Sequence, residues 1–402
     1  MVGKQKRKIA FVVQRCGVEV NGGAEKHCLD VARSLADEDQ IEIITTCALD
    51  YVTWANYYPP GDEIVDGVTI RRFPVAEERN PKAFEALCIG LEGKKNKRNQ
   101  DKQEAWLRAQ GPWSPELLEY LKQHRQDYDA FVFFAYLYGH TYFGLPLVAE
   151  RALLAPLAHD EWPIHMSSWD EIFKLPQGFL FNTLEEKAFL QKRFPAHGID
   201  GPVIGVAVEP LKATNPERFR REHNLPEEFL LYVGRIDRLK GCGELFHWFL
   251  KHRAWGGKPE KLVLLGNPVM EIPRHPDILS LGFVSEETKW DALAACTAVV
   301  MSSEFESLSM ALLEAWSMGK PVLVNGKSPV LVGQCKRSNG GLWYKDYTRF
   351  SVGLETVRNP EIGPILGQQG KQFVKDHYSW PVIRKAYLDQ VDAMMAARGE
   401  TR

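Results

Sequence analysis

Short apolar runs alternate with stretches of helical spacing along almost the whole chain, and this alternation restricts the fold more than any other feature. Residues 9–13 are apolar and rich in β-branched side chains, residues 41–45 are again strand-like, and residues 24–35 between them carry apolar side chains at helical spacing. A strand, a helix and a strand in this order predict a parallel unit with a right-handed crossover. We therefore expect an α/β fold with doubly wound sheets.

The alternation occurs in two series, which predicts two domains. Strands are expected at 131–134 and 178–181, before a helix at 184–194, and then at 229–233, 262–265, 298–300 and 321–324. A chain of 402 residues is longer than a single domain with one hydrophobic core usually is. Pro210 and Pro216 interrupt regular structure between the two series. We predict domains at residues 1–205 and 206–378, with a ligand cleft between them.

A polar, basic run interrupts the first series. Residues 93–102 read Gly-Lys-Lys-Asn-Lys-Arg-Asn-Gln-Asp-Lys and are followed by Trp106 and Trp113. We expect a helical insertion at about residues 85–120 with an exposed basic face. Such a run is usually a solvated surface, and docking on an anionic lipid or polymer is the alternative. The net charge of −2 gives no indication of a nucleic-acid partner.

Cysteine usage and hydropathy indicate a cytoplasmic protein. The seven cysteines are odd in number and contain no C-x-x-C pair, which argues against a disulfide framework or a zinc ribbon. Residues 9–13 are too short for the apolar region of a signal peptide. The sequence has no run close to the roughly 18 to 20 apolar residues of a membrane span. Peripheral contact with the inner face of the membrane is the alternative that the basic run leaves open.

Two carboxylates separated by seven residues carry most of the functional information. Glu306 and Glu314 lie between an apolar strand at 298–302 and a helix stop at residues 319–321, Gly-Lys-Pro. Glu306 is expected in a strand-to-helix loop and Glu314 inside the helix. Both then lie at the carboxyl edge of a parallel sheet, where doubly wound proteins bind ligands. A ribose or sugar diol is one partner for Glu314, and a backbone group or Arg is the structural alternative.

Other predicted strand ends carry further candidates. Arg235 and Lys240 follow the strand at 229–233, where cations and a helix N-terminus favour an anion such as phosphate. His159 follows the apolar segment 153–157, and Gly22 and Gly23 precede the first helix, where paired glycines allow a ligand close to the backbone. Taken singly, these features also fit a surface loop, a structural histidine and a tight turn.

Together these motifs occur in the order found in the retaining glycosyltransferases of family four. The motifs are Gly22-Gly-Ala-Glu25, His159-Asp160, the Arg235 and Lys240 pair, Gly282-Phe-Val-Ser-Glu-Glu-Thr-Lys289 and Glu306-x7-Glu314. The chain resembles a bacterial nucleotide-sugar-dependent enzyme of polysaccharide biosynthesis with the GT-B fold, over nearly its full length and most strongly from 229 to 325. The tail, residues 379–402, resembles the helix that crosses back to the first domain in that fold.

The resemblance implies sugar transfer from a nucleoside diphosphate sugar to a glycan or lipid-linked glycan, with retention and without a metal or another cofactor. Arg235 and Lys240 would neutralise the diphosphate and the charge that grows on it as the glycosidic bond breaks. Glu306 would bind donor-sugar hydroxyls, Glu314 the ribose, and His159 would lie beside the anomeric centre. The other donor-site residues implied are Gly22, Gly23, Gly234, Phe283, Val284, Ser307, Leu308 and Ser309.

Four residues are candidates for the acceptor side. Glu25 and the aromatic segment with Tyr136, Tyr138 and His140 are expected there, where a sugar ring could stack, and core packing is the alternative.

The family often has Glu-Gly-Phe-Gly where residues 306–309 read Glu-Ser-Leu-Ser, which replaces both glycines. The Asp-x-Asp triplets at 37–39 and 127–129 precede predicted strands, and this is the wrong edge of the sheet for a metal site.

Four other functions share parts of this pattern. A dehydrogenase is disfavoured because neither first turn contains G-x-G-x-x-G. A sugar-nucleotide 2-epimerase or a phosphorylase would use the same architecture, and product analysis separates them from a transferase. The alternative of another class is a catalytically inactive homologue that binds a nucleotide or a glycan and acts as an assembly partner. Turnover with a true acceptor separates that alternative from an enzyme.

Overall fold

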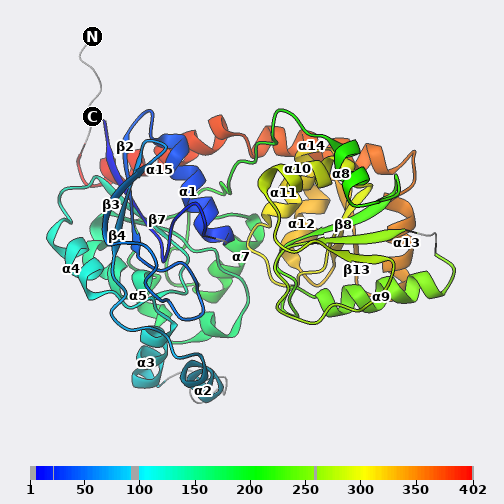
Figure 1. The fold of residues 1–402 in the computed structure, drawn as a ribbon. Coiled ribbons are helices and arrows are strands. Elements are labelled where there is room, and N and C mark those ends of the chain that lie inside the picture. Colours follow the sequence, from blue (N-terminus) through cyan, green and yellow to red (C-terminus); the bar gives the residue numbers. More distant parts are fainter. Residues whose placement is uncertain (1–5, 21, 92–98, 258–259, 401–402) are drawn as a thin grey trace, which may run out of the picture. The chain divides into compact units, whose positions relative to one another are not determined.

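The computed structural model describes residues 6–20, 22–91, 99–257 and 260–400 and divides the chain into two compact units. Unit 1 contains Met1–Val206 and Trp380–Arg402, and unit 2 contains Ala207–Ser379 (Figure 1). Much of the predicted basic face, Lys94, Lys95, Lys97 and Arg98, lies outside the described residues.

In the described residues, unit 1 is built on a seven-stranded sheet with the order β3-β4-β2-β1-β5-β6-β7. Its strands are β1 Lys8–Val12, β2 Gln40–Thr46, β3 Gly61–Val65, β4 Val68–Phe73, β5 Ala130–Phe134, β6 Ala152–Ala155 and β7 Gly178–Phe179. β3 runs antiparallel to β4, and the remaining neighbours are parallel. The predicted doubly wound sheet is confirmed. The β3–β4 hairpin was not predicted, because β3 is largely exposed and lacks a buried apolar face.

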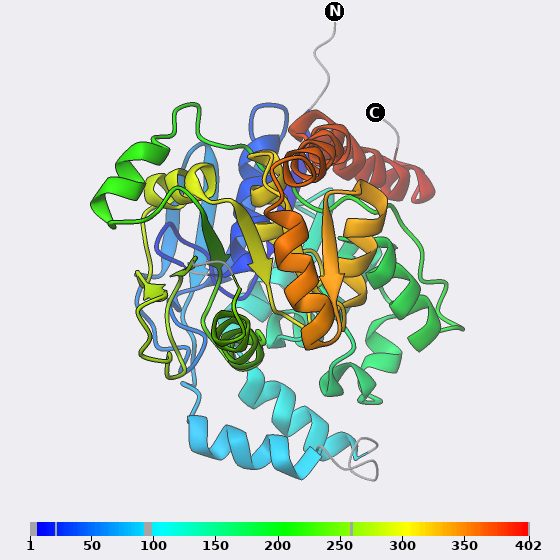
Figure 2. The ribbon, with the colours of Figure 1, turned by 90° about the vertical axis from the view of Figure 1, so that its right-hand side faces the viewer.

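Helices cover this sheet and extend beyond it. The helices of unit 1 are α1 Gly23–Leu35, α2 Pro81–Leu91, α3 Gln100–Gln110, α4 Pro115–Gln123, α5 Gly139–Gly144, α6 Trp169–Ile172, α7 Leu184–Arg193 and α15 Trp380–Ala397, with 3-10 helices η2 Leu145–Arg151 and η3 Trp162–His165. α2 and α3 contact each other and project from the sheet as a pair (Figures 1 and 2). They occupy the region in which the helical insertion was predicted.

The C-terminal helix α15 belongs to unit 1 and packs against α1, as the GT-B resemblance implied. Arg7 links it to the sheet: its Nε lies 3.1 Å from the Asp39 carboxylate, and its Nη1 lies 2.8 Å from Asp392 Oδ1 on α15. The side chains of Arg7 and Asp39 are only 7% and 1% exposed. Because Asp39 directly precedes β2, this ion pair joins the amino ends of β1 and β2 to the terminal helix.

Unit 2 is built, in the part of the chain that the structure describes, on a six-stranded parallel sheet with the order β10-β9-β8-β11-β12-β13. The strands are β8 Phe229–Val233, β9 Lys261–Leu265, β10 Ile278–Ser280, β11 Ala298–Met301, β12 Val322–Asn325 and β13 Gly341–Tyr344. The four central strands were predicted and are confirmed. β10 and β13 were not predicted, because they are short edge strands with partly exposed side chains.

The helices of unit 2 flank its strands (Figure 2). They are α8 Pro216–Glu222, α9 Cys242–Ala254, α10 Glu286–Ala295, α11 Met310–Ser317, α12 Pro329–Ser338, α13 Tyr347–Val357 and α14 Gly363–His377. Glu306 lies in the loop between β11 and α11, and Glu314 lies inside α11, as the sequence predicted. Across the described ranges of both units, none of the helices combines the length and the apolar character that a bilayer crossing requires.

The buried ion pair between Arg7 and Asp39 provides a stability test. We expect Asp39→Ala to lower the free energy of unfolding of unit 1 by about 3 kcal/mol, because it leaves the Arg7 guanidinium buried without its principal counter-charge. Asp389→Ala is the matched control, since it removes an exposed α15 pair with Lys385 and should cost less than about 1 kcal/mol. Scanning calorimetry of both variants measures the difference, and equal losses would contradict the assignment.

Candidate functional site

The carboxyl ends of the strands of unit 2 are joined by backbone hydrogen bonds. Gly234 N donates to Leu265 O at 2.9 Å, and Gly266 N donates to Gly282 O at 2.7 Å. A Cβ atom on Gly266, whose φ is +141°, would lie 2.0 Å from the Gly234 carbonyl oxygen. Only glycine permits this approach. The loop that starts at Gly234 is therefore fixed against the neighbouring strand end.

Lys240 and Glu306 meet at this edge. Lys240 Nζ lies 2.8 Å from Glu306 Oε1, with the two side chains 33% and 15% exposed. Ser302 Oγ donates to the carbonyl oxygen of Lys240 at 2.7 Å, and a Cβ on Gly241 would lie 2.0 Å from the Ser302 carbonyl oxygen. These contacts join the loop after β8 to the end of β11. The structure thus brings two of the predicted catalytic residues together.

Arg235 is held on the same loop. Its Nε lies 2.8 Å from Asp237 Oδ2, and its carbonyl oxygen accepts a hydrogen bond from the Tyr232 hydroxyl at 2.8 Å. The Arg235 side chain is 36% exposed. A guanidinium group has five donors and an ammonium group has three, so each cation can contact an acid and a bound anion together. Arg235 and Lys240 therefore form a cationic edge that can receive phosphate.

Glu314 is paired with a residue to which the sequence gave no role. Its Oε1 lies 2.6 Å from Lys289 Nζ of α10, and the side chains of Glu314 and Lys289 are 6% and 12% exposed. Burial works against the charge of Lys289, but the neighbouring Glu314 and Glu286 carboxylates hold its pKa above the ordinary value. A cation does satisfy Glu314, as the structural alternative expected, although it is Lys289 rather than an arginine.

Ser309 has a backbone conformation that favours glycine. Its φ of +76° lies in the left-handed region, directly before α11. This is the second position at which the family often has glycine. Ser307 occupies the first of these positions, and its φ is not positive. The chain therefore keeps the local conformation at Ser309 without the glycine, and the strain amounts to about 1 kcal/mol.

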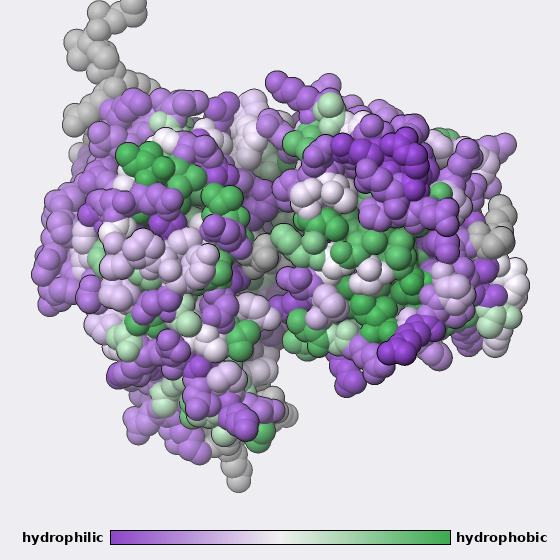
Figure 3. Space-filling model, in the orientation of Figure 1, coloured by the Kyte–Doolittle hydropathy of each residue, from purple (hydrophilic) through white to green (hydrophobic). Residues whose placement is uncertain are grey.

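Exposed apolar side chains follow the same strand ends of unit 2. Phe283, one of the donor-site residues that the resemblance implied, is 63% exposed and directly follows Gly282. Leu239 is 69% exposed, Val269 60% and Phe305 42%, and they lie on the loops after β8, β9 and β11. Figure 3 shows apolar side chains gathered on the surface of unit 2. Flat or apolar parts of a ligand can pack on such side chains.

In unit 1, His159 lies in the loop after β6 and is partly exposed. Its Nδ1 is 3.5 Å from Glu161 Oε1, and the same oxygen accepts a hydrogen bond from the Tyr136 hydroxyl at 2.9 Å. Tyr136 is 1% exposed, and burial raises its pKa well above the ordinary value. Tyr136 is therefore a buried donor that orients Glu161 toward His159.

The aromatic segment after β5 is part of the core. His140 is 2% exposed, and its Nε2 lies 2.8 Å from the Phe134 carbonyl oxygen. Burial lowers the pKa of His140 to about 4, so the ring is neutral near pH 7. Tyr138 packs edge-on against Trp54, with ring centroids 5.7 Å apart. Neither Tyr136 nor His140 presents a face on which a sugar could stack, so core packing, the alternative interpretation, describes both residues.

Glu25 forms a buried ion pair that the sequence did not indicate. Arg15 Nε lies 2.6 Å from Glu25 Oε1, with the side chains 6% and 7% exposed, and Arg15 Nη1 donates to the Leu49 carbonyl oxygen. A Cβ on Gly22 would lie 2.0 Å from Glu25 Oε2, so Gly22 admits this carboxylate. A Cβ on Gly23 would meet no described atom within 4 Å. The sequence carries no local signal for this pair, because it depends on how the loop after β1 packs against α1.

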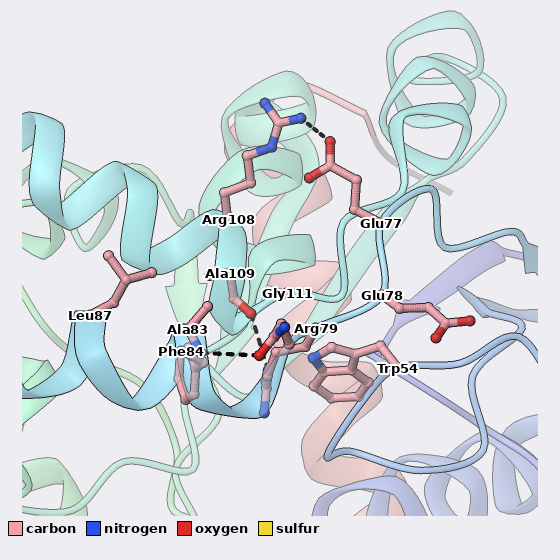
Figure 4. Close-up of a pocket in the computed structure, with 11 residues that line it drawn as sticks. Trp54, Glu77, Glu78, Arg79, Ala83, Phe84, Leu87, Arg108, Ala109 and Gly111 are labelled. Atoms are coloured by element: carbon pink, nitrogen blue, oxygen red, sulfur yellow. Dashed lines mark hydrogen bonds and ion pairs between the residues drawn. The ribbon is translucent and has the colours of Figure 1, made fainter.

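A cavity of about 120 Å³ in unit 1 is lined by residues to which the sequence gave no role, although Trp54 in its lining packs against Tyr138 (Figure 4). The Arg79 guanidinium lies over the Trp54 and Phe84 rings and donates to the carbonyl oxygens of Tyr51, Ala109 and Gln110. Burial lowers the pKa of Arg79 to about 10. Its donors thus join the end of α3 to the loop after β2. The lining residues are Trp54, Glu77, Glu78, Arg79, Asn80, Ala83, Phe84, Leu87, Arg108, Ala109 and Gly111.

The Asp-x-Asp triplets serve the amino ends of strands. Asp39 pairs with Arg7, and Asp129 Oδ2 accepts a hydrogen bond from Lys8 N at 2.8 Å. Within the described ranges, the structure has no group of three or more His, Cys, Asp or Glu side chains arranged to hold a metal ion.

Comparisons with known proteins give a matching family and a relative. Residues 214–349 match the family described as "Glycosyl transferases group 1". An uncharacterized glycosyltransferase of Methanocaldococcus jannaschii is 25% identical over 189 residues, which are 43% of this chain and 47% of that protein. The chain therefore spans about half the length of this relative.

Solved structures share the fold. Sucrose-phosphate synthase of Thermosynechococcus elongatus aligns with a TM-score of 0.70 and 17% identity, over 98% of this chain and 100% of its own. HepE of Anabaena, in complex with UDP and glucose, aligns with a TM-score of 0.64 and 15% identity, over 96% and 99%.

The two serines of the loop before α11 provide a matched pair of variants. We expect the free energy of unfolding of unit 2 to be about 1 kcal/mol higher in Ser309→Gly than in Ser307→Gly, because only the change at residue 309 relieves a positive φ. Both changes add similar backbone entropy to the unfolded chain, and this cost cancels in the comparison. Calorimetry compares the two variants, and equal stability would contradict the idea.

Proposed function

We propose that this chain, whose residues 214–349 match the group 1 glycosyl transferases and which has the GT-B fold, transfers a sugar from a nucleoside diphosphate sugar to an acceptor with retention of the anomeric configuration. The observation that carries the proposal is the cationic edge of unit 2, where Arg235 and Lys240 lie on one fixed loop and Lys240 pairs with Glu306. These residues lie inside the segment that matches the family.

The two cations stabilise the leaving group. As the bond between the sugar and the diphosphate breaks, negative charge grows on the phosphate oxygens, and fixed cations lower the energy of that transition state. Asp237 and Glu306 hold Arg235 and Lys240 in position before the donor binds. Glu306 then accepts hydrogen bonds from hydroxyls of the donor sugar.

The donor is bound along the same edge. Gly234 allows the backbone close to the phosphates, Glu314 accepts from the ribose hydroxyls while Lys289 holds its Oε1, and the exposed ring of Phe283 packs near the base. The remaining donor contacts of unit 2 come from the backbone of Val284, Ser307, Leu308 and Ser309. Since the HepE structure holds UDP and glucose, a UDP-sugar is the first donor to test.

The acceptor hydroxyl attacks from the face that the diphosphate leaves. A diphosphate oxygen takes the proton of that hydroxyl as the new glycosidic bond forms, so no protein nucleophile and no metal are needed. His159 orients donor hydroxyls or stabilises positive charge near the anomeric carbon. Glu25 and Tyr138 of unit 1 are assigned to the acceptor side, while Tyr136 and His140 support it from the core.

We assign the acceptor to the class of glycans and lipid-linked glycans, on the cytoplasmic side and with peripheral membrane contact when the acceptor is on a lipid. The second candidate function is an inactive homologue that binds a nucleotide or a glycan as an assembly partner. The pairing of Glu314 with Lys289 favours that candidate, because a ribose must share this carboxylate. Turnover of donor distinguishes the two functions.

Substitution of the cations tests the proposal. We expect Arg235→Ala and Lys240→Ala each to lower the rate of UDP release from a UDP-sugar by on the order of 10²-fold, because each removes a stabiliser of the leaving group. The assay contains EDTA, so that any activity is metal-independent. Arg238→Ala, an exposed cation on the same loop, is the control and should keep the wild-type rate. Near-normal rates in both test variants would refute the phosphate assignment.

A further inference from the structure

Glu186 is a buried carboxylate in unit 1 that the proposed chemistry does not use. It lies in the first turn of α7 and is 1% exposed. Its two oxygens accept hydrogen bonds from backbone N–H groups of two different segments: Ala158 N donates to Oε1 and Asn182 N donates to Oε2, each at 2.7 Å. Burial raises the pKa of Glu186 to about 8, while these amide donors favour the carboxylate.

Part of this arrangement is an ordinary helix start. Thr183 is the N-cap of α7, and its Oγ1 accepts from Glu186 N at 3.2 Å. A threonine followed three residues later by a glutamate is a capping box, in which the glutamate returns to the backbone at the N-cap. A capping box alone explains a contact with the segment before α7. It does not explain a bond to the loop after β6.

The bond to Ala158 reaches the residue directly before His159. Ala158 is also buried, and the preceding Leu157 has a φ of +52°, in the left-handed region that a branched side chain rarely adopts. This conformation is strained and persists only where surrounding contacts enforce it. The Glu186 carboxylate is such a contact, because it fixes the N–H group that follows Leu157.

We propose that Glu186 is a positioning residue: its carboxylate holds the strained turn at Leu157 and Ala158 and thereby sets the place of His159 for sugar transfer. The inference rests on the proposed function for the role of His159. The contact between Glu186 and Ala158 is itself independent of that role. A displacement of about 1 Å at a reacting group can cost as much as 10²-fold in rate, so the loss of this bond should be visible in turnover.

Glu186→Asp is the first test, because a carboxylate one methylene shorter retains the local cap and withdraws from Ala158. We expect UDP release from a UDP-sugar to slow by about tenfold, with little change in the donor KM. Thr183→Ala is the matched control: it removes the cap oxygen on the same helix and should lower the melting temperature without slowing turnover. Equal slowing by both variants would show a general effect of helix stability and would overturn the inference.

A double-mutant cycle shows whether Glu186 acts through His159. If it does, Glu186→Asp in the His159→Ala background slows UDP release no further, because the group that it positions is already absent. Multiplying effects would contradict the inference. If Glu186→Asp does not fold, Glu186→Gln takes its place in the cycle, since it keeps the length and replaces one acceptor oxygen by a donor.

Hydrogen exchange gives a readout that needs no turnover. In Glu186→Asp, the peptide with residues 156–160 should exchange faster than in wild type, and in Thr183→Ala it should not. Unchanged exchange in Glu186→Asp would refute the claim that Glu186 holds the turn at Leu157 and Ala158. If the wild type releases no UDP from any nucleotide sugar, the proposed function is refuted instead. If His159→Ala slows UDP release but Glu186→Asp does not, only the inference is refuted.

Discussion

The close approach of the loop after β8 to the end of β11 is the constraint on which the candidate donor site depends. Gly241 leaves room for the Ser302 carbonyl oxygen, and the Ser302 hydroxyl binds the Lys240 carbonyl oxygen. The backbone of Lys240 is therefore fixed by β11, the strand that leads to Glu306. A side chain on residue 241 would separate the two loops and with them the Lys240–Glu306 pair.

Charged side chains at the candidate site of unit 2 are paired: Lys240 with Glu306 and Glu314 with Lys289 from other segments, and Arg235 with Asp237 on its own loop. In unit 2 the pairing places cations where a diphosphate would bind, so an anionic ligand enters a site whose cations are already oriented. In unit 1 the paired charges are more deeply buried: Arg15 neutralises Glu25, and backbone N–H groups donate to the Glu186 carboxylate. Preorganisation of this kind lowers the cost of ordering side chains when a ligand arrives.

The sequence predicted much of the fold and fewer of the contacts. Strand and helix periodicity gave the central strands of both sheets and the placement of Glu306 and Glu314, because periodicity and turn residues are local signals. The partners Lys289, Arg15 and Ala158 could not be predicted, since each pairing depends on how distant segments pack. The burial of Tyr136 and His140 was ambiguous for a related reason: an aromatic run at a strand end fits a core as well as a surface.

Titration calorimetry of UDP and of uridine, with wild type and Lys240→Ala in the presence of EDTA, tests the central claim most directly. The difference in affinity between the two ligands isolates the contribution of the diphosphate, and parallel titrations with GDP, ADP, CDP and TDP cover the other bases. The account predicts that wild type binds one nucleoside diphosphate much more tightly than its nucleoside and that Lys240→Ala loses most of this difference. Equal affinity for diphosphate and nucleoside, or no binding of any diphosphate, would contradict it.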